Sequence, residues 1–127
     1  MNNRDTVLII EDDEKAAIAI ADHFEKNNCQ VVCMAAVDEM TGPLIKGRDY
    51  RWEIKGVSIN MGRVCEAFVD YQIYGKFNGS DVVLELNKHG VPSITAISSS
   101  RPYNERMLKA GATHALLKPD FLKSLMG

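Results

Sequence analysis

The chain lacks the features that mark membrane, secreted and nucleic-acid-binding proteins. No apolar run approaches the length that spans a bilayer, and residues 1–5 (MNNRD) lack the hydrophobic segment of a signal peptide. The formal net charge is only −2, and no basic stripe with interleaved aromatic residues is present. We therefore expect a cytoplasmic protein with no membrane and no direct nucleic-acid partner.

Cysteine is also scarce. The three cysteines, Cys29, Cys33 and Cys65, are odd in number, which argues against a disulfide framework and agrees with a reducing compartment. Cys29 and Cys33 lie near His23, but a zinc site of this kind would need a second ligand pair. Buried thiols that act as small hydrophobic groups are the better interpretation.

The length and the composition of the chain predict a single domain spanning 1–127. Apolar residues make up 46% of the 127, which is ordinary for a globular protein with a real core. Short β-branched runs alternate with helical patterns, and this alternation predicts an α/β fold with a doubly wound, five-stranded parallel sheet. The predicted strands are Thr6–Ile10, Gln30–Ala35, Val64–Val69, Pro92–Ser98 and Thr113–Leu117.

Three helices are predicted between these strands. Apolar residues spaced at i, i+3, i+4 and i+7 from Ala17 to Phe24 indicate the first, with Asp12 or Asp13 as its cap. The second covers about residues 80–89 and ends at Gly90. Pro102 suits the first turn of the third.

Polar and charged residues follow four of the strands. In a parallel sheet the binding site lies outside the carboxyl ends of the strands, so we expect these side chains to meet at one edge. They are Glu11, Asp12 and Asp13 after the first strand, Asp70 after the third, Ser98, Ser99 and Ser100 at the fourth, and Lys118 after the fifth.

Such a set has the chemistry of phosphoryl transfer. Neighbouring carboxylates repel one another unless a cation compensates, and Mg²⁺ is commonly held by one or two carboxylates together with a phosphate. One carboxylate can then act as a nucleophile, while an ammonium and a hydroxyl contact the phosphoryl oxygens. Taken singly, Asp12 is equally well a helix cap, Asp70 a turn residue and Lys118 a solvated lysine. Their joint occurrence at the strand ends favours the site.

The same residues resemble the receiver domains of bacterial response regulators. VLIIEDD (7–13) is similar to the acidic-pair motif of that family, and FVDYQIYGKFNGSDVV (68–83) to its phosphoacceptor strand and loop. SITAIS (93–98) and AGATHALLKP (110–119) are similar to its last two strands. The resemblance covers nearly the whole chain and implies a flavodoxin-like sheet of strand order 2-1-3-4-5.

The resemblance also implies a role for each site residue. Asp70 would be the phosphoacceptor, Asp12 a direct Mg²⁺ ligand, Glu11 an indirect one, and the backbone carbonyl of Gln72 a further ligand. Ser98 and Lys118 would contact the phosphoryl group, and the Lys118–Pro119 bond would be cis. The domain would assist its own phosphorylation and dephosphorylation without being an enzyme, and its partner would be a sensor histidine kinase or a phosphotransfer protein.

Two departures from the family pattern bear on function. The stretch 36–63 is longer than the family's second-helix crossover requires, and we expect a β-type insertion at about 46–63, with a turn at Lys55-Gly56 or within Asn60–Gly62. It is either an ordinary surface insertion or a surface for a partner or a homodimer. Ala115 stands where the family often carries an aromatic residue that reports phosphorylation.

Two alternative functions remain at this point. A pseudo-receiver would keep the fold as a protein-interaction module that is not controlled by phosphorylation, and Ala115 favours it. A magnesium-dependent phosphatase would use Asp70 as nucleophile, but such enzymes commonly place an acid two residues later, where this chain has Gln72.

Overall fold

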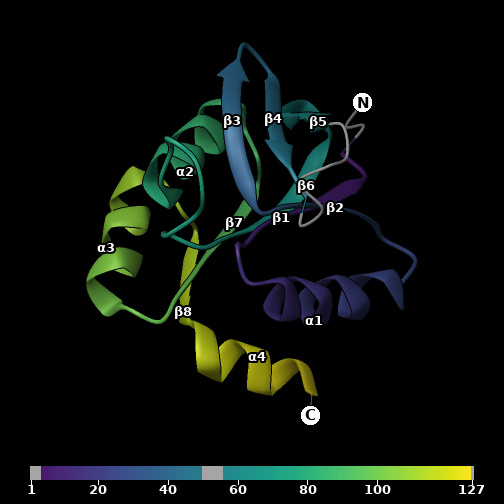
Figure 1. Ribbon diagram of the computed structural model, residues 1–127, viewed down its shortest axis with the longest axis vertical. Coiled ribbons are helices and arrows are strands. Elements are labelled where there is room, and N and C mark those ends of the chain that lie inside the picture. Colours follow the sequence, from purple (N-terminus) through teal and green to yellow (C-terminus); the bar gives the residue numbers. More distant parts are fainter. Residues whose placement is uncertain (1–3, 50–55, 127) are drawn as a thin grey trace.

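Two sheets build the structure, a computed structural model that describes residues 4–49 and 56–126 (Figure 1). The larger sheet is parallel and has the order β2-β1-β6-β7-β8. Numbered along the chain, these five strands have the order 2-1-3-4-5, which confirms the predicted doubly wound, flavodoxin-like sheet. The strands are β1 (Thr6–Ile10), β2 (Gln30–Met34), β6 (Val64–Val69), β7 (Ser93–Ser98) and β8 (His114–Leu117).

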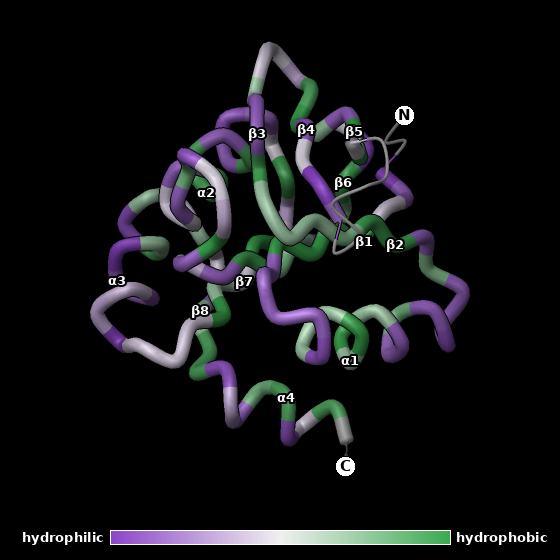
Figure 2. The backbone as a smooth tube through the Cα atoms, in the orientation of Figure 1, coloured by the Kyte–Doolittle hydropathy of each residue, from purple (hydrophilic) through white to green (hydrophobic). Residues whose placement is uncertain are grey.

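The central strands are apolar along their length because helices or strands cover both of their faces. All five residues of β1 are buried, and Figure 2 shows the hydrophobic colour running through the centre of the sheet. Alternate residues therefore serve two separate cores. Leu8 and Ile10 belong to one core, and Val7 and Ile9 belong to the other.

Helices α1 (Glu14–Glu25) and α4 (Lys118–Met126) cover one face of the sheet. Asp13 caps α1 by accepting a hydrogen bond from the Lys15 amide, as one of the two predicted caps. Beneath the helices, Phe68 of β6 stacks on Phe121 of α4 with ring centroids 5.2 Å apart. The three cysteines are free thiols that pack against this core, which agrees with the interpretation as small hydrophobic groups.

Helices α2 (Gly79–Lys88) and α3 (Arg101–Ala110) cover the opposite face (Figure 1). A capping box joins Asn78 and Asp81 at the start of α2. Pro102 lies in the first turn of α3, as predicted. The structure adds Ser100 as the cap of this helix. Among the helices in the described ranges, none combines the length and the hydropathy needed to cross a membrane.

A three-stranded antiparallel sheet connects β2 to β6. Its strands are β3 (Ala36–Thr41), β4 (Leu44–Arg48) and β5 (Val57–Asn60), and the short 3₁₀ helix η1 (Met61–Arg63) leads into β6. Val37, Ile45 and Ile59 pack into the same core as Val82 and Leu86 of α2. This small sheet therefore covers part of the face that α2 and α3 cover.

The predicted bounds of the insertion were wrong at the start. Extended structure begins at Ala36 rather than near residue 46, and the first turn lies at Gly42-Pro43. The physical reason is an irregularity in the β3–β4 pairing between Val37 and Glu39, which breaks the alternation of buried and exposed residues. Of the two predicted turns, Lys55 lies outside the described residues. Asn60–Gly62 runs from the end of β5 into η1 and so connects β5 to β6 of the other sheet, instead of closing a hairpin.

Candidate phosphoryl-transfer site

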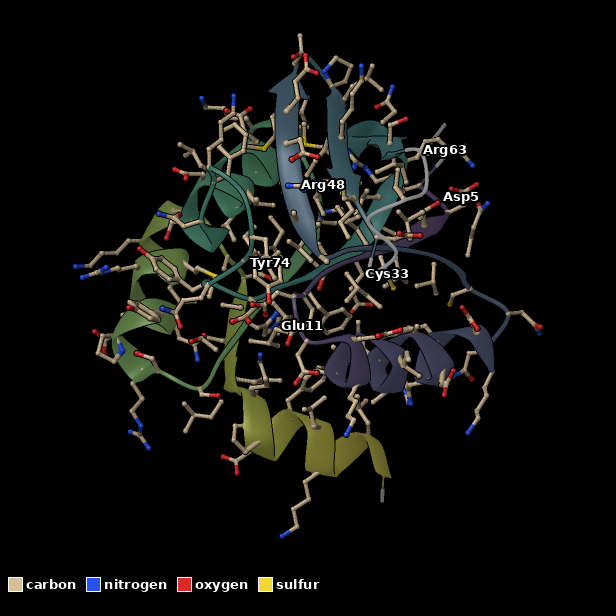
Figure 3. All side chains as sticks on the ribbon, in the orientation of Figure 1. Asp5, Glu11, Cys33, Arg48, Arg63 and Tyr74 are labelled. Atoms are coloured by element: carbon tan, nitrogen blue, oxygen red, sulfur yellow. The ribbon has the colours of Figure 1, made fainter. Side chains whose placement is uncertain are left out.

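Two neighbouring strands place two carboxylates side by side. In the parallel pair β1–β6, Ile10 lies opposite Val69, so Glu11 and Asp70 leave the sheet at the same level. The Asp70 amide donates to the Ile10 carbonyl at 2.9 Å, and the Glu11 amide donates to the Met34 carbonyl at 3.0 Å. These bonds continue the ladder one residue beyond the strands. Both side chains are buried, Glu11 completely. Figure 3 labels Glu11 at this edge of the sheet.

Lys118 reaches this pair from the far end of the chain. It begins α4 directly after β8, and its Nζ donates to Glu11 Oε1 at 2.5 Å and to Asp70 Oδ2 at 3.0 Å. The Lys118 side chain is only 16% exposed, so water screens these ion pairs less than it would at the surface. Residues from three of the four predicted strand ends therefore meet in one contact.

A third carboxylate completes the group. Asp12 is half-buried, and one oxygen of each of Glu11, Asp12 and Asp70 lies within 4.8 Å of the others. Three carboxylates face the single ammonium group of Lys118. The group therefore carries more negative charge than Lys118 can balance when all of its members are ionised.

The pKa shifts of these groups result first from burial and then from this excess of negative charge. Burial, and then the charge of Asp70, raise the pKa of Glu11 to about 8, although Lys118 acts in the opposite direction. The same two causes raise the pKa of Asp12. Burial alone would lower the pKa of Lys118, but its hydrogen bonds to Glu11 and Asp70 and their charges outweigh burial and raise it. Lys118 therefore stays charged, and the carboxylates remain short of positive charge.

A hard divalent cation fits this donor set. Mg²⁺ prefers carboxylate and carbonyl oxygens and is commonly held by one or two carboxylates. Glu11, Asp12 and Asp70 offer such oxygens within one small volume, of which Asp12 is the most accessible to solvent. Gln72, the predicted source of a backbone ligand, lies on the exposed loop after β6, and its role stays a prediction.

Ser98 ends β7 with its side chain buried. Its Oγ accepts a hydrogen bond from the Ser100 amide at 3.1 Å, and its own amide donates to Asn104 Oδ1 at 3.0 Å. The predicted contact of Ser98 with a phosphoryl group stays a prediction. The structure adds Asn104, which the sequence analysis missed because a polar residue in the middle of an amphipathic helix is ordinarily exposed.

The start of α2 packs directly against the backbone of Asp70. The Gly79 amide donates to the Tyr71 carbonyl at 2.8 Å. A Cβ atom at Gly79 would lie 2.4 Å from the Asp70 carbonyl oxygen and 2.7 Å from the Tyr71 Cα. Only glycine permits this approach.

Aromatic residues lie on the loop that follows Asp70 and on α3 instead of at position 115. Ala115 is half-buried in β8 and lines a groove of about 260 Å³ between α3 and β8. Tyr71, next to Asp70, stacks on Tyr103 of α3. His114 is exposed and adjoins Thr113, so it does not replace the missing aromatic residue.

The prediction of a cis bond before Pro119 was wrong. The described residues contain no cis peptide bond. The reason is local: α4 begins at Lys118 itself, so Pro119 occupies the first turn of a helix, where its fixed φ suits the regular trans backbone.

Several solved structures with a similar arrangement of strands and helices are receiver domains of response regulators. The beryllofluoride-activated N-terminal receiver domain of Klebsiella pneumoniae RstA superposes with a TM-score of 0.63 at 21% identity, over 95% of this chain and 94% of that one. A CheY-like receiver domain protein from Methanospirillum hungatei JF-1 gives a TM-score of 0.62 at 16% identity, over 97% and 91% of the two chains. This chain has the receiver-domain fold.

Another receiver-fold neighbour was solved with ligands. A response regulator protein from Burkholderia pseudomallei, with a phosphorylated aspartic acid, a calcium ion and citrate, gives a TM-score of 0.63 at 19% identity, covering 95% of this chain and 64% of its own. No protein-family model matches the present sequence, and no curated protein matches it. The likeness therefore lies in the three-dimensional fold, at sequence identities too low to carry residue roles.

Proposed function

We propose that this chain is a receiver domain of a two-component or phosphorelay system, in which Asp70 accepts a phosphoryl group in a Mg²⁺-dependent reaction. The observation that carries the proposal is the contact of the Lys118 amine with both Glu11 and Asp70. In this contact an ammonium group after β8 lies against buried carboxylates after β1 and β6 of a receiver fold. A surface lysine or a turn aspartate would not need such a contact.

The two oxygens of Asp70 have different surroundings. Oδ1 accepts a hydrogen bond from the Tyr71 amide at 2.8 Å, and Oδ2 lies in the contact with Lys118. The Tyr71 bond orients the carboxylate, and Lys118 holds Oδ2 within the group of charges. The main chain thus presents the nucleophile, with positive charge beside the place where phosphoryl oxygens would lie.

The transfer forms one bond and breaks one. A carboxylate oxygen of Asp70 bonds to phosphorus, and the P–N bond of a phosphohistidine or the P–O bond of an acyl phosphate breaks. The leaving group keeps the electron pair. Asp12, Asp70 and the Gln72 carbonyl would hold Mg²⁺ directly and Glu11 indirectly, and the ion when bound offsets the negative charge of carboxylates and phosphoryl oxygens. Lys118 and Ser98 would contact those oxygens.

The domain so described acts on itself and has no separate substrate. Hydrolysis of the aspartyl phosphate by water returns Asp70 to its starting state. The proposed phosphodonor is a sensor histidine kinase or a phosphotransfer protein, and we place the reaction in the cytoplasm, where three free thiols are stable.

Labelling with acetyl phosphate tests this function. Wild-type protein should gain one phosphoryl group in Mg²⁺ and none in EDTA, and Asp70→Asn should gain none. Asp120→Asn is the matched control, because Asp120 is exposed in the first turn of α4 and should leave labelling unchanged. Equal labelling of Asp70→Asn and the wild type would refute the proposal.

The second candidate is an interaction module that phosphorylation does not control. Ala115 favours it, because the aromatic side chain that reports phosphorylation in similar domains is missing. Backbone NMR spectra with Mg²⁺ and beryllofluoride distinguish the two functions. Shifts at Asp70, Ser98 and Lys118 support the phosphoacceptor, and unchanged spectra support the interaction module.

A further inference from the structure

Asn104 is a buried polar residue whose side-chain hydrogen bonds go to β7, which ends at Ser98, and to β8, which directly precedes Lys118. It lies on α3 and is 6% exposed. Its Oδ1 accepts from the Ser98 amide at 3.0 Å, and its Nδ2 donates to the Ser98 carbonyl at 3.3 Å and to the Leu116 carbonyl at 3.0 Å. The carboxamide thus uses its acceptor and both of its donor hydrogens.

These three bonds close the carboxyl end of the β7–β8 pair. Ser98 lies opposite Leu117 in the parallel register, and no further pairing of the two strands follows within this region of the described chain. At this end the Asn104 side chain bonds to backbone amide and carbonyl groups of both strands. Since Leu116 lies two residues before Lys118, the side chain fixes the separation of the backbone that carries Ser98 from the backbone that carries Lys118.

The position of Asn104 separates it from the three carboxylates. Glu11, Asp12 and Asp70 follow β1 and β6, whereas the bonds of Asn104 join α3 to β7 and β8. A change at Asn104 should therefore act first on Ser98 and Lys118, and on the carboxylates only through the contacts of Lys118 with Glu11 and Asp70.

We propose that Asn104 is a positioning residue for phosphoryl recognition, which sets the Ser98 hydroxyl and the Lys118 amine at the spacing that lets both reach one phosphoryl group. This inference rests on the proposed function of Asp70.

The test compares two affinities in two variants of the full chain. Asn104→Ala removes all three bonds. Glu105→Ala is the matched control. Glu105 is the next residue of α3, is exposed, and lines the groove between α3 and β8 together with Asn104. NMR titrations measure the affinity for Mg²⁺ alone and the affinity for beryllofluoride at saturating Mg²⁺.

The expected size of the effect follows from geometry. A displacement of reacting groups by about 1 Å can lower a reaction rate on the order of 100-fold. We expect Asn104→Ala to weaken beryllofluoride binding roughly 10- to 100-fold and Mg²⁺ binding less than about twofold.

Further variants keep the inference open to refutation. Asn104→Gln retains the carboxamide and should recover part of the beryllofluoride affinity. If Asn104→Ala does not fold, Asn104→Asp keeps the shape and the acceptor but loses both donors, and it should show the same selective loss.

Three outcomes would overturn the inference, and the two affinities distinguish them. Equal beryllofluoride affinity in Asn104→Ala and Glu105→Ala removes the positioning role. A parallel loss of Mg²⁺ and beryllofluoride affinity shows a purely structural role. Wild-type protein that binds Mg²⁺ but shows no response to beryllofluoride refutes the proposed function itself, and this inference with it.

Discussion

The ring of Tyr71 stacks on the ring of Tyr103, with centroids 4.1 Å apart and an angle of 15° between the planes. Tyr71 follows Asp70 and donates its amide hydrogen to the Asp70 carboxylate, whereas Tyr103 belongs to α3. Arg106 of the same helix lies over both rings and donates to the Tyr71 hydroxyl at 3.2 Å. The side chains of Tyr71, Tyr103 and Arg106 therefore connect the loop that follows Asp70 to α3.

Removal of the Tyr103 ring should loosen this connection. A stacked aromatic pair contributes about 1 kcal/mol beyond its buried area, so Tyr103→Ala should lower the free energy of unfolding by at least that amount. Tyr103→Phe keeps the ring and should stay within about 0.5 kcal/mol of wild type. Urea unfolding measures both variants. Equal stabilities of the Ala and Phe variants would show that the stack contributes nothing.

Gly79→Ala should displace the loop that follows Asp70. Its new Cβ would collide with the backbone of Asp70 and Tyr71, and relief of such a clash typically costs about 1–3 kcal/mol. The shift of the loop should also slow labelling of Asp70 by acetyl phosphate.

The neighbouring Ser80→Ala provides the comparison for this substitution. It removes a hydroxyl that has no hydrogen-bond partner among the described residues, so it should be neutral or slightly stabilising. Thermal unfolding and labelling rates distinguish the two variants. A Gly79→Ala protein that labels at the wild-type rate with unchanged stability would contradict the close packing described for α2.

Two adjacent acidic residues should differ in their effect on metal binding. Asp12 belongs to the carboxylate group, whereas Asp13 caps α1. Asp12→Asn should weaken Mg²⁺ binding by about tenfold or more, because even residues outside the immediate ligand set change metal affinity by that factor. Asp13→Asn keeps a good cap and should bind Mg²⁺ as the wild type does. Calorimetric titration would contradict this assignment if the two variants had equal affinities.

The Cys33 thiol should react slowly in the folded protein. Burial, and secondarily the charge of Glu25, raise the pKa of Cys33 to about 11. Because a raised pKa favours the neutral thiol, only about one molecule in a thousand carries the reactive thiolate at pH 8. Alkylation by iodoacetamide should therefore speed up about tenfold per pH unit above pH 8.

Peptide mapping by mass spectrometry measures this rate, and protein unfolded in urea gives the reference. Reaction of Cys33 at pH 8 as fast in the folded as in the unfolded chain would show that the thiol is not shielded.

The sequence sufficed to predict the parallel sheet and its strand-end residues because these depend on local patterns. The run TVLII has the length and the β-branched composition of a strand that is buried on both faces, and Glu11 and Asp12 follow it directly. The register of β1 with β6 then brings Asp70 beside Glu11 without any further information.

The missed features arise from contacts between distant residues. The irregular pairing at Val37 and Glu39 hides the alternation of β3, and so the start of the small sheet was predicted too late. Asn104 is buried only because β7 and β8 present carbonyl and amide groups to it. Glu11 was assigned an indirect role beside a metal, and its direct bond to Lys118 depends on a residue 107 positions away.

Identification of the modified residue tests the phosphoacceptor assignment most directly. Protein treated with acetyl phosphate and Mg²⁺ is reduced with borohydride, which converts an aspartyl phosphate to homoserine, and is then mapped by mass spectrometry. We predict homoserine at position 70 alone, and none when EDTA replaces Mg²⁺. Homoserine at another position, or an unmodified Asp70 in protein that has taken up phosphate, would contradict the assignment.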